Sequence, residues 1–212
     1  MNKTGQIVFV AAALGCMSPM AALAQSFEGS ISGGVSRISG KSADLGTLGA
    51  TTNPDGTVSN LEATLTNGFR LTFRMTFNMY RFAGAEVGYA YNRTHLHESV
   101  GTVTVQDLGG MAIHQGFGDF LLYATPEGSR IRPFAAGGIQ FSNFVPPGAS
   151  AQYGQGENKF GVNYGAGVKV KLFGPWQVRF DIRQYNMGKP FGLGGSGRLN
   201  LNEFSAGVGI AI

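Results

Sequence analysis

Residues 69–79 read FRLTFRMTFNM and alternate without a break between apolar and polar side chains. Large apolar residues occupy every odd position, while arginine, threonine or asparagine occupies every even one. Because successive side chains of a β-strand point to opposite faces, this period of two predicts a strand with one apolar and one polar face. A tilted strand of about ten residues with an apolar outer face is what crosses a bilayer in a closed barrel.

The same alternation recurs in seven further segments, which gives eight predicted strands, an even number. Short turns at 80–82, 125–129 and 174–175 alternate with long polar or glycine-rich segments. Short turns at one rim and long loops at the other are typical of a transmembrane barrel and are not typical of a β-sandwich. The expected strands are 27–36, 69–79, 83–92, 111–124, 131–141, 160–172, 176–183 and 204–212.

The first 24 residues have the pattern of a secretory signal peptide. Lys3 precedes an uncharged apolar stretch, and a small-residue A-x-A cleavage site ends at Ala24. We therefore predict that residues 1–24 are removed and that residues 25–212 form the barrel. Two alternatives are an uncleaved N-terminal helix and lipidation at Cys16, which closes a stretch, ALGC, that distantly resembles a lipoprotein box.

Composition excludes several classes of function. Cys16 is the only cysteine, so cleavage after Ala24 leaves no disulfide and no cysteine-ligated metal. Loss of Lys3 leaves 15 basic and 12 acidic residues, a net charge of +3, which is too small to indicate nucleic-acid binding. No apolar run after the signal peptide reaches the roughly 18 residues of a spanning helix. We therefore expect the chain to enter a membrane as strands.

The polar faces of the predicted strands carry seven basic and four acidic residues. An eight-stranded barrel is about wide enough for its own side chains to fill it, and buried charges have to be paired and hydrogen-bonded. We predict a salt-bridge network that closes the lumen; a narrow passage that prefers anions is the alternative, since bases outnumber acids. The residues predicted to form the network are Glu28, Arg70, Arg74, Glu86, Asp119, Arg132, Lys169, Lys171, Arg179, Asp181 and Arg183.

Other candidate sites are incomplete, and no cofactor is expected. His95 and His97 share a strand face, but Glu98 is the only acidic residue beside them in the sequence, so solvated side chains are predicted rather than a metal site. No serine is spaced to share a face with His114, so no hydrolytic triad and no enzymatic activity are predicted. The stretch GLGGSG (192–197) has no lysine after it and predicts a flexible surface loop rather than a phosphate-binding loop.

The whole mature chain resembles the small eight-stranded outer-membrane β-barrel proteins of the opacity-protein and OmpA-type broad class. The resemblance rests on the signal peptide, on RIRPFAAGGIQF (130–141), on YGAGVKVKLFGPWQVRFDIRQY (164–185) and on the alternating C-terminus. Members commonly end in an aromatic residue used in assembly, whereas this chain ends Ile210-Ala211-Ile212. The resemblance implies an all-β, antiparallel, up-and-down transmembrane barrel in the bacterial outer membrane, and it says almost nothing about activity.

Two functions remain open. The first is a non-enzymatic structural or surface-interaction role, in which outer-membrane lipid surrounds the wall and the long loops contact extracellular or envelope partners. The alternative is a narrow channel or a lateral conduit for small apolar or anionic solutes. Segment 39–68 is polar and rich in small residues, which favours the first, because a funnel for apolar ligands needs an apolar lining. The long loops are expected at 39–68, 93–110, 143–159 and 186–200.

Overall fold

The computed structural model describes residues 26–38, 43–52, 55–100, 103–150, 154, 156–195 and 197–212. The predicted signal peptide (1–24), including Cys16, lies outside the described residues. The described residues contain no helix that is long and apolar enough to cross a membrane.

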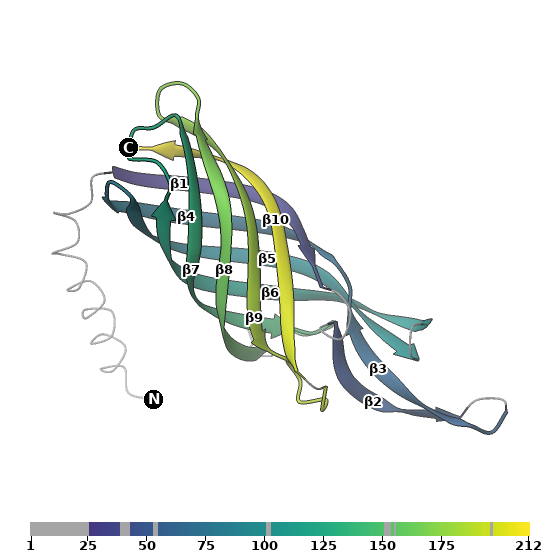
Figure 1. Cartoon of the computed structure of the whole chain (residues 1–212). Helices are drawn as coiled ribbons and strands as arrows, with labels where there is room; N and C mark the ends of the chain where they lie inside the picture. Colours follow the sequence, from purple (N-terminus) through teal and green to yellow (C-terminus); the bar gives the residue numbers. More distant parts are fainter. Residues whose placement is uncertain are drawn as a thin grey trace.

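Eight antiparallel strands within the described residues close into a barrel, which confirms the predicted fold class (Figure 1). Around the wall the order is β1, β4, β5, β6, β7, β8, β9 and β10, and pairing of β10 with β1 completes the circuit. The wall strands are β1 (Ser26–Arg37), β4 (Gly68–Tyr80), β5 (Ala83–Val100), β6 (Val103–Tyr123), β7 (Ile131–Val145), β8 (Glu157–Lys171), β9 (Trp176–Gly188) and β10 (Arg198–Ala211).

The prediction of long loops at 39–68 and 93–110 is wrong. The first segment contains a hairpin of β2 (Asp44–Thr52) and β3 (Val58–Leu65), and the second consists mainly of the ends of β5 and β6. Irregular pairing between β2 and β3 breaks the period of two, which is why alternation did not reveal the hairpin.

The hairpin extends the barrel wall beyond its rim. Because β3 pairs with the end of β5, strands β2, β3, β5 and β6 form a four-stranded sheet in that order. We call this the projecting sheet: β2, β3, residues 94–100 of β5 and residues 103–110 of β6. Figure 1 shows it extending from the end of the barrel opposite the C-terminus.

Side-chain polarity inverts along the barrel axis. Towards the short turns the strands place apolar residues outside and charged residues inside; Phe73 is 46% exposed and Arg74 only 1%. Towards the projecting sheet the order is reversed, and Leu199 and Leu201 of β10 point inward and are fully buried. Only the part of the wall that faces lipid needs an apolar outer surface, so the inversion marks the outer edge of the membrane-facing band.

The inner volume beyond this edge is filled by an apolar core. The connection between β9 and β10 contributes to it, since Phe191 and Leu193 pack against it. The buried residues of this core are Ile38, Leu45, Ala63, Leu65, Ala90, Leu96, Met111, Ile113, Phe117, Phe144, Tyr185, Met187, Leu199 and Leu201.

The GLGGSG segment, predicted to be a flexible surface loop, is attached through its described residues to the start of β2. Gly46 forms an isolated bridge with Gly194, and the N–H of Thr47 donates to the carbonyl of Leu193 at 3.0 Å. Gly46 has a φ of 123°, and a Cβ there would overlap the carbonyl oxygen of Leu193. Glycine at this position therefore allows the two backbones to meet over the mouth of the barrel.

Candidate functional site: the charged interior

Six basic and five acidic side chains are buried within the described residues of the barrel. Ten of the eleven predicted network residues are among them, and Lys171 is not. Glu203, which was not predicted, is fully buried in β10. The predicted excess of seven bases over four acids is thus reduced to near balance, which removes the charge argument for an anion-preferring passage. The buried charges are arranged in three layers.

The first layer lies at the short-turn end and centres on Glu28 of β1. Its carboxylate accepts hydrogen bonds from Lys169 Nζ at 2.5 Å and from Gln177 Nε2 at 2.9 Å. The guanidinium of Arg132 lies 3.8 Å from the same carboxylate and stacks over the Tyr123 ring, 3.6 Å from its centroid. Asn78 of β4 also donates to Glu28, at 2.7 Å, so that four strands, β4, β7, β8 and β9, contribute charged or polar groups around one acid.

The second layer holds two arginines between three acids. Arg179 donates to Glu86 at 2.5 Å and to Asp181 at 2.7 Å. Arg183 donates to Glu86 at 2.7 Å and to Asp181 at 3.1 Å, and it also pairs with Asp119. Because each guanidinium is shared by carboxylates on opposite sides of the barrel, the layer forms a continuous plate across the lumen.

The third layer centres on Glu203 and borders the apolar core. One carboxylate oxygen accepts from Arg70 Nε at 3.0 Å and from the Tyr185 hydroxyl at 2.7 Å; the other accepts from Arg74 Nη2 at 2.7 Å. The Arg70 guanidinium also stacks 4.4 Å from the Tyr185 ring centroid. Glu203 was missed because its neighbours Leu199 and Leu201 are apolar and point inward, so the strand was predicted to begin only at residue 204.

Arg74 connects the second and third layers. Besides Glu203 it lies 3.6 Å from Glu86 and 3.9 Å from Asp181. Together the layers leave the centre of the barrel occupied by paired side chains, with a charged portion towards the short turns and an apolar portion above it.

Lys171 was predicted to belong to the network, and this prediction is wrong because its side chain is exposed. It is the last residue of β8, two positions beyond the buried Lys169, where the barrel wall ends. With Lys169 and Arg132 it lines an open cavity of about 230 Å³ at the short-turn rim. A cation at this position is solvated and needs no buried partner.

The three histidines all lie outside the charged interior. His114 is on the outward face of β6, where Nδ1 lies 2.6 Å from the Tyr89 hydroxyl and the ring lies beside that of Tyr91. His95 and His97 lie on the outward face of the projecting sheet beside Asp107 of β6. A hydrogen bond from the N–H of Gly109, and the adjacent His95, lower the pKa of the Asp107 carboxyl below its usual range.

Comparisons with known proteins agree with this architecture. Residues 8–211 match the family model described as outer membrane protein beta-barrel domain. A comparison with curated protein sequences found no match.

Solved structures share the fold at low sequence identity. The crystal structure of the outer membrane protein OprG from Pseudomonas aeruginosa matches with a TM-score of 0.59 and 15% identity, covering 87% of this chain and 95% of that one. Neisserial surface protein A matches with a TM-score of 0.51 and 12% identity, covering 87% and 96% of the two chains. The N-terminal barrel domain of P. aeruginosa OprF matches with a TM-score of 0.51 and 9% identity, covering 89% and 99%.

Proposed function

Because this chain belongs to the outer membrane protein beta-barrel domain family and lies in the bacterial outer membrane, we propose that it is a non-conducting barrel that presents the projecting sheet to partners outside the cell. The observation that carries the proposal is the continuation of β5 and β6 past the barrel rim to pair with the β2–β3 hairpin. Crossing a bilayer requires only about ten residues per strand, so this extension has no role within the membrane.

The arrangement of the connections supports an extracellular position for this sheet. The connections 81–82, 124–130 and 172–175 are short, and the projecting sheet is at the opposite rim. Barrels of this kind have short periplasmic turns and long extracellular loops. The hairpin also exposes apolar side chains to solvent, with Leu48 44% and Val58 69% exposed. In the part of the chain that the structure describes, β2 is the outer strand of this sheet, and only its start is bridged, to residues 193–195. Exposed apolar groups beside such an edge are suited to contact with another protein surface.

The occupied interior supports the absence of conduction. The three charged layers and the apolar core fill successive levels of the barrel, and nearly all of their side chains are shielded from solvent. An eight-stranded barrel leaves little free volume once its interior is packed.

A conduit for small apolar solutes is the second candidate, and the apolar core in the outer part of the interior favours it. In this arrangement the core is closed over by residues 191–195, so a solute could enter only after that segment had moved. A lateral conduit would then raise uptake of apolar solutes by intact cells, whereas the proposed display role leaves uptake unchanged.

Two experiments test the proposal. Val58→Cys should react with a membrane-impermeant maleimide on intact cells, whereas Ser129→Cys, at the opposite rim, should react only after permeabilisation.

In the second experiment, residues 47–61 are replaced by a two-residue turn. Adhesion of cells carrying the wild-type protein or this variant is then measured on coated and cellular surfaces. We expect adhesion to at least one surface to fall while heat-modifiable gel mobility still reports a folded barrel. Equal adhesion on every surface, or labelling of Ser129→Cys in intact cells, would contradict the proposal.

A further inference from the structure

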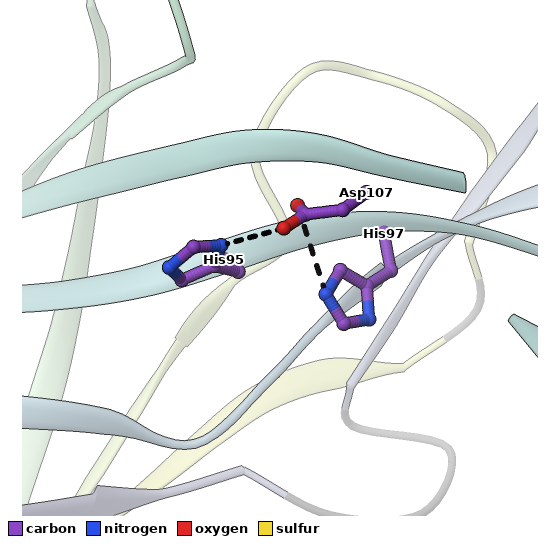
Figure 2. Close-up of side chains that lie close together, drawn as sticks. All are labelled: His95, His97 and Asp107. Carbon is purple, nitrogen blue, oxygen red and sulfur yellow. Dashed lines mark hydrogen bonds and ion pairs between the residues drawn. The ribbon is translucent and has the colours of Figure 1, made fainter.

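Three metal-binding side chains converge on the outward face of the projecting sheet. His95 and His97 come from β5, and Asp107 comes from β6 (Figure 2). His95 Nδ1 lies 3.0 Å from Asp107 Oδ2, and His97 Nε2 lies 3.7 Å from Asp107 Oδ1. One ligand atom from each residue lies within 4.8 Å of the other two. Ligands around a tetrahedral zinc ion are roughly 3.3 Å apart, so small rotations of the side chains would complete the geometry.

A β-bulge brings Asp107 to this face. Leu96 pairs with Gly109, but the next residue, His97, pairs with Asp107, so Leu108 is an extra residue in β6. Strict alternation from the barrel would turn Asp107 towards the inside, and the bulge reverses that direction. Gly109 adopts the φ of 111° that the bulge uses. The sequence alone therefore could not place this carboxylate beside the two histidines.

Contacts with neighbouring residues hold Asp107 and the backbone of His95 in position. The N–H of Gly109 donates to Asp107 Oδ1 at 2.8 Å. On the other side, the hydroxyl oxygen of Thr66 accepts from the N–H of His95 at 3.1 Å, and the N–H of Thr66 donates to the His95 carbonyl at 3.0 Å. The His97 side chain is 25% exposed and the other two about half exposed, so the site is open to solvent. A preformed and accessible set of ligands reduces the ordering cost of binding.

We infer that His95, His97 and Asp107 form a binding site for a divalent transition-metal ion of the Zn²⁺ class, open to solvent. Two imidazoles and one carboxylate suit zinc and its neighbours, and they do not suit Mg²⁺ or Ca²⁺, which prefer oxygen ligands. Three protein ligands leave at least one coordination position for water or for a group from another molecule. The inference does not rest on the proposed display function, since it requires only that the sheet be solvent-accessible.

The test is a calorimetric titration with Zn²⁺. The protein is the folded full-length barrel in lipid nanodiscs, with any affinity tag removed. We expect one ion per chain and at least about a tenfold loss of affinity in His95→Ala, in His97→Ala and in Asp107→Asn. Mg²⁺ at the same concentration should give no signal. Heat-modifiable gel mobility confirms that each variant is folded.

Two matched controls separate this site from adventitious binding. His114→Ala removes the remaining histidine, and Glu98→Gln removes the acidic residue next to His97 in the sequence; neither should alter affinity or stoichiometry. Absence of Zn²⁺ binding, equal binding by Asp107→Asn, or a loss in Glu98→Gln matching that in Asp107→Asn would overturn the inference.

Discussion

Replacing Glu203 by glutamine should destabilise the barrel strongly, although the two side chains are nearly the same size. Glu203 is fully buried, and its carboxylate accepts hydrogen bonds from Arg70, Arg74, Tyr185 and Ser205. Each oxygen has one arginine and one hydroxyl as partners. In either orientation of the glutamine side chain, its NH₂ group would therefore face an arginine, so that two hydrogen-bond donors oppose each other.

The magnitude follows from the partners that remain. A hydrogen bond to a charged group contributes about 1.5–3 kcal/mol, and at least one such bond to arginine is lost. Within the described residues Glu203 is the only acid paired with Arg70, so that cation would remain buried without a counter-charge. Breaking a buried ion pair from one side costs about 3–5 kcal/mol, and we expect a loss of free energy of unfolding in this range.

The assay is reversible urea unfolding in lipid vesicles, with Glu157→Gln as the matched control. Glu157 pairs with Lys159 at 2.6 Å in a partly exposed position, where an ion pair contributes about 0–1 kcal/mol. Its carboxylate also accepts from the N–H of Phe191, and the side-chain oxygen of glutamine can accept that bond as well. If Glu203→Gln costs no more than Glu157→Gln, the interior charges do not hold the barrel together and the reasoning fails.

Two further substitutions test other parts of the structure. Phe73→Arg, in the middle of the lipid-facing band, should lower the free energy of unfolding in vesicles by about 2–4 kcal/mol, whereas Phe160→Arg, near the outer edge, should lower it by about 0–1 kcal/mol. Equal losses would contradict the assigned membrane position. Gly46→Ala should accelerate hydrogen exchange of the Thr47 amide, because the new Cβ overlaps the Leu193 carbonyl, whereas Gly49→Ala should not, because the space around Gly49 is open. Unchanged exchange in both variants would refute the attachment over the barrel mouth.

Alternation predicted the membrane-embedded part of the barrel well. Along β4 the outward Phe73 and the inward Arg74 follow the binary pattern because lipid lies on one side and a charged interior on the other. In β6 the apolar Phe117 and Leu121 occur on the same face as Asp119, and the acid alone indicated that this face points inward; all three are buried.

Beyond the outer edge of the band the same rule gave wrong results for physical reasons. There the outside is water and the interior is an apolar core, so the polarity of the two faces inverts. Because the inward neighbours of Glu203 are leucines, the predicted strand excluded them and Glu203 together. Bulges caused the remaining failures: they hid the β2–β3 hairpin and turned Asp107 towards His97. A bulge depends on pairing between strands, which a single sequence does not display.

The most direct test of the central claim, a barrel closed along its interior, is planar-bilayer recording of the purified protein. Because paired charges and an apolar core occupy successive levels of the barrel within the described residues, we expect the wild-type protein to insert without producing steady current. Insertion is verified separately by protease protection and heat-modifiable mobility. Steady currents that grow with salt concentration would show an open lumen and contradict the account.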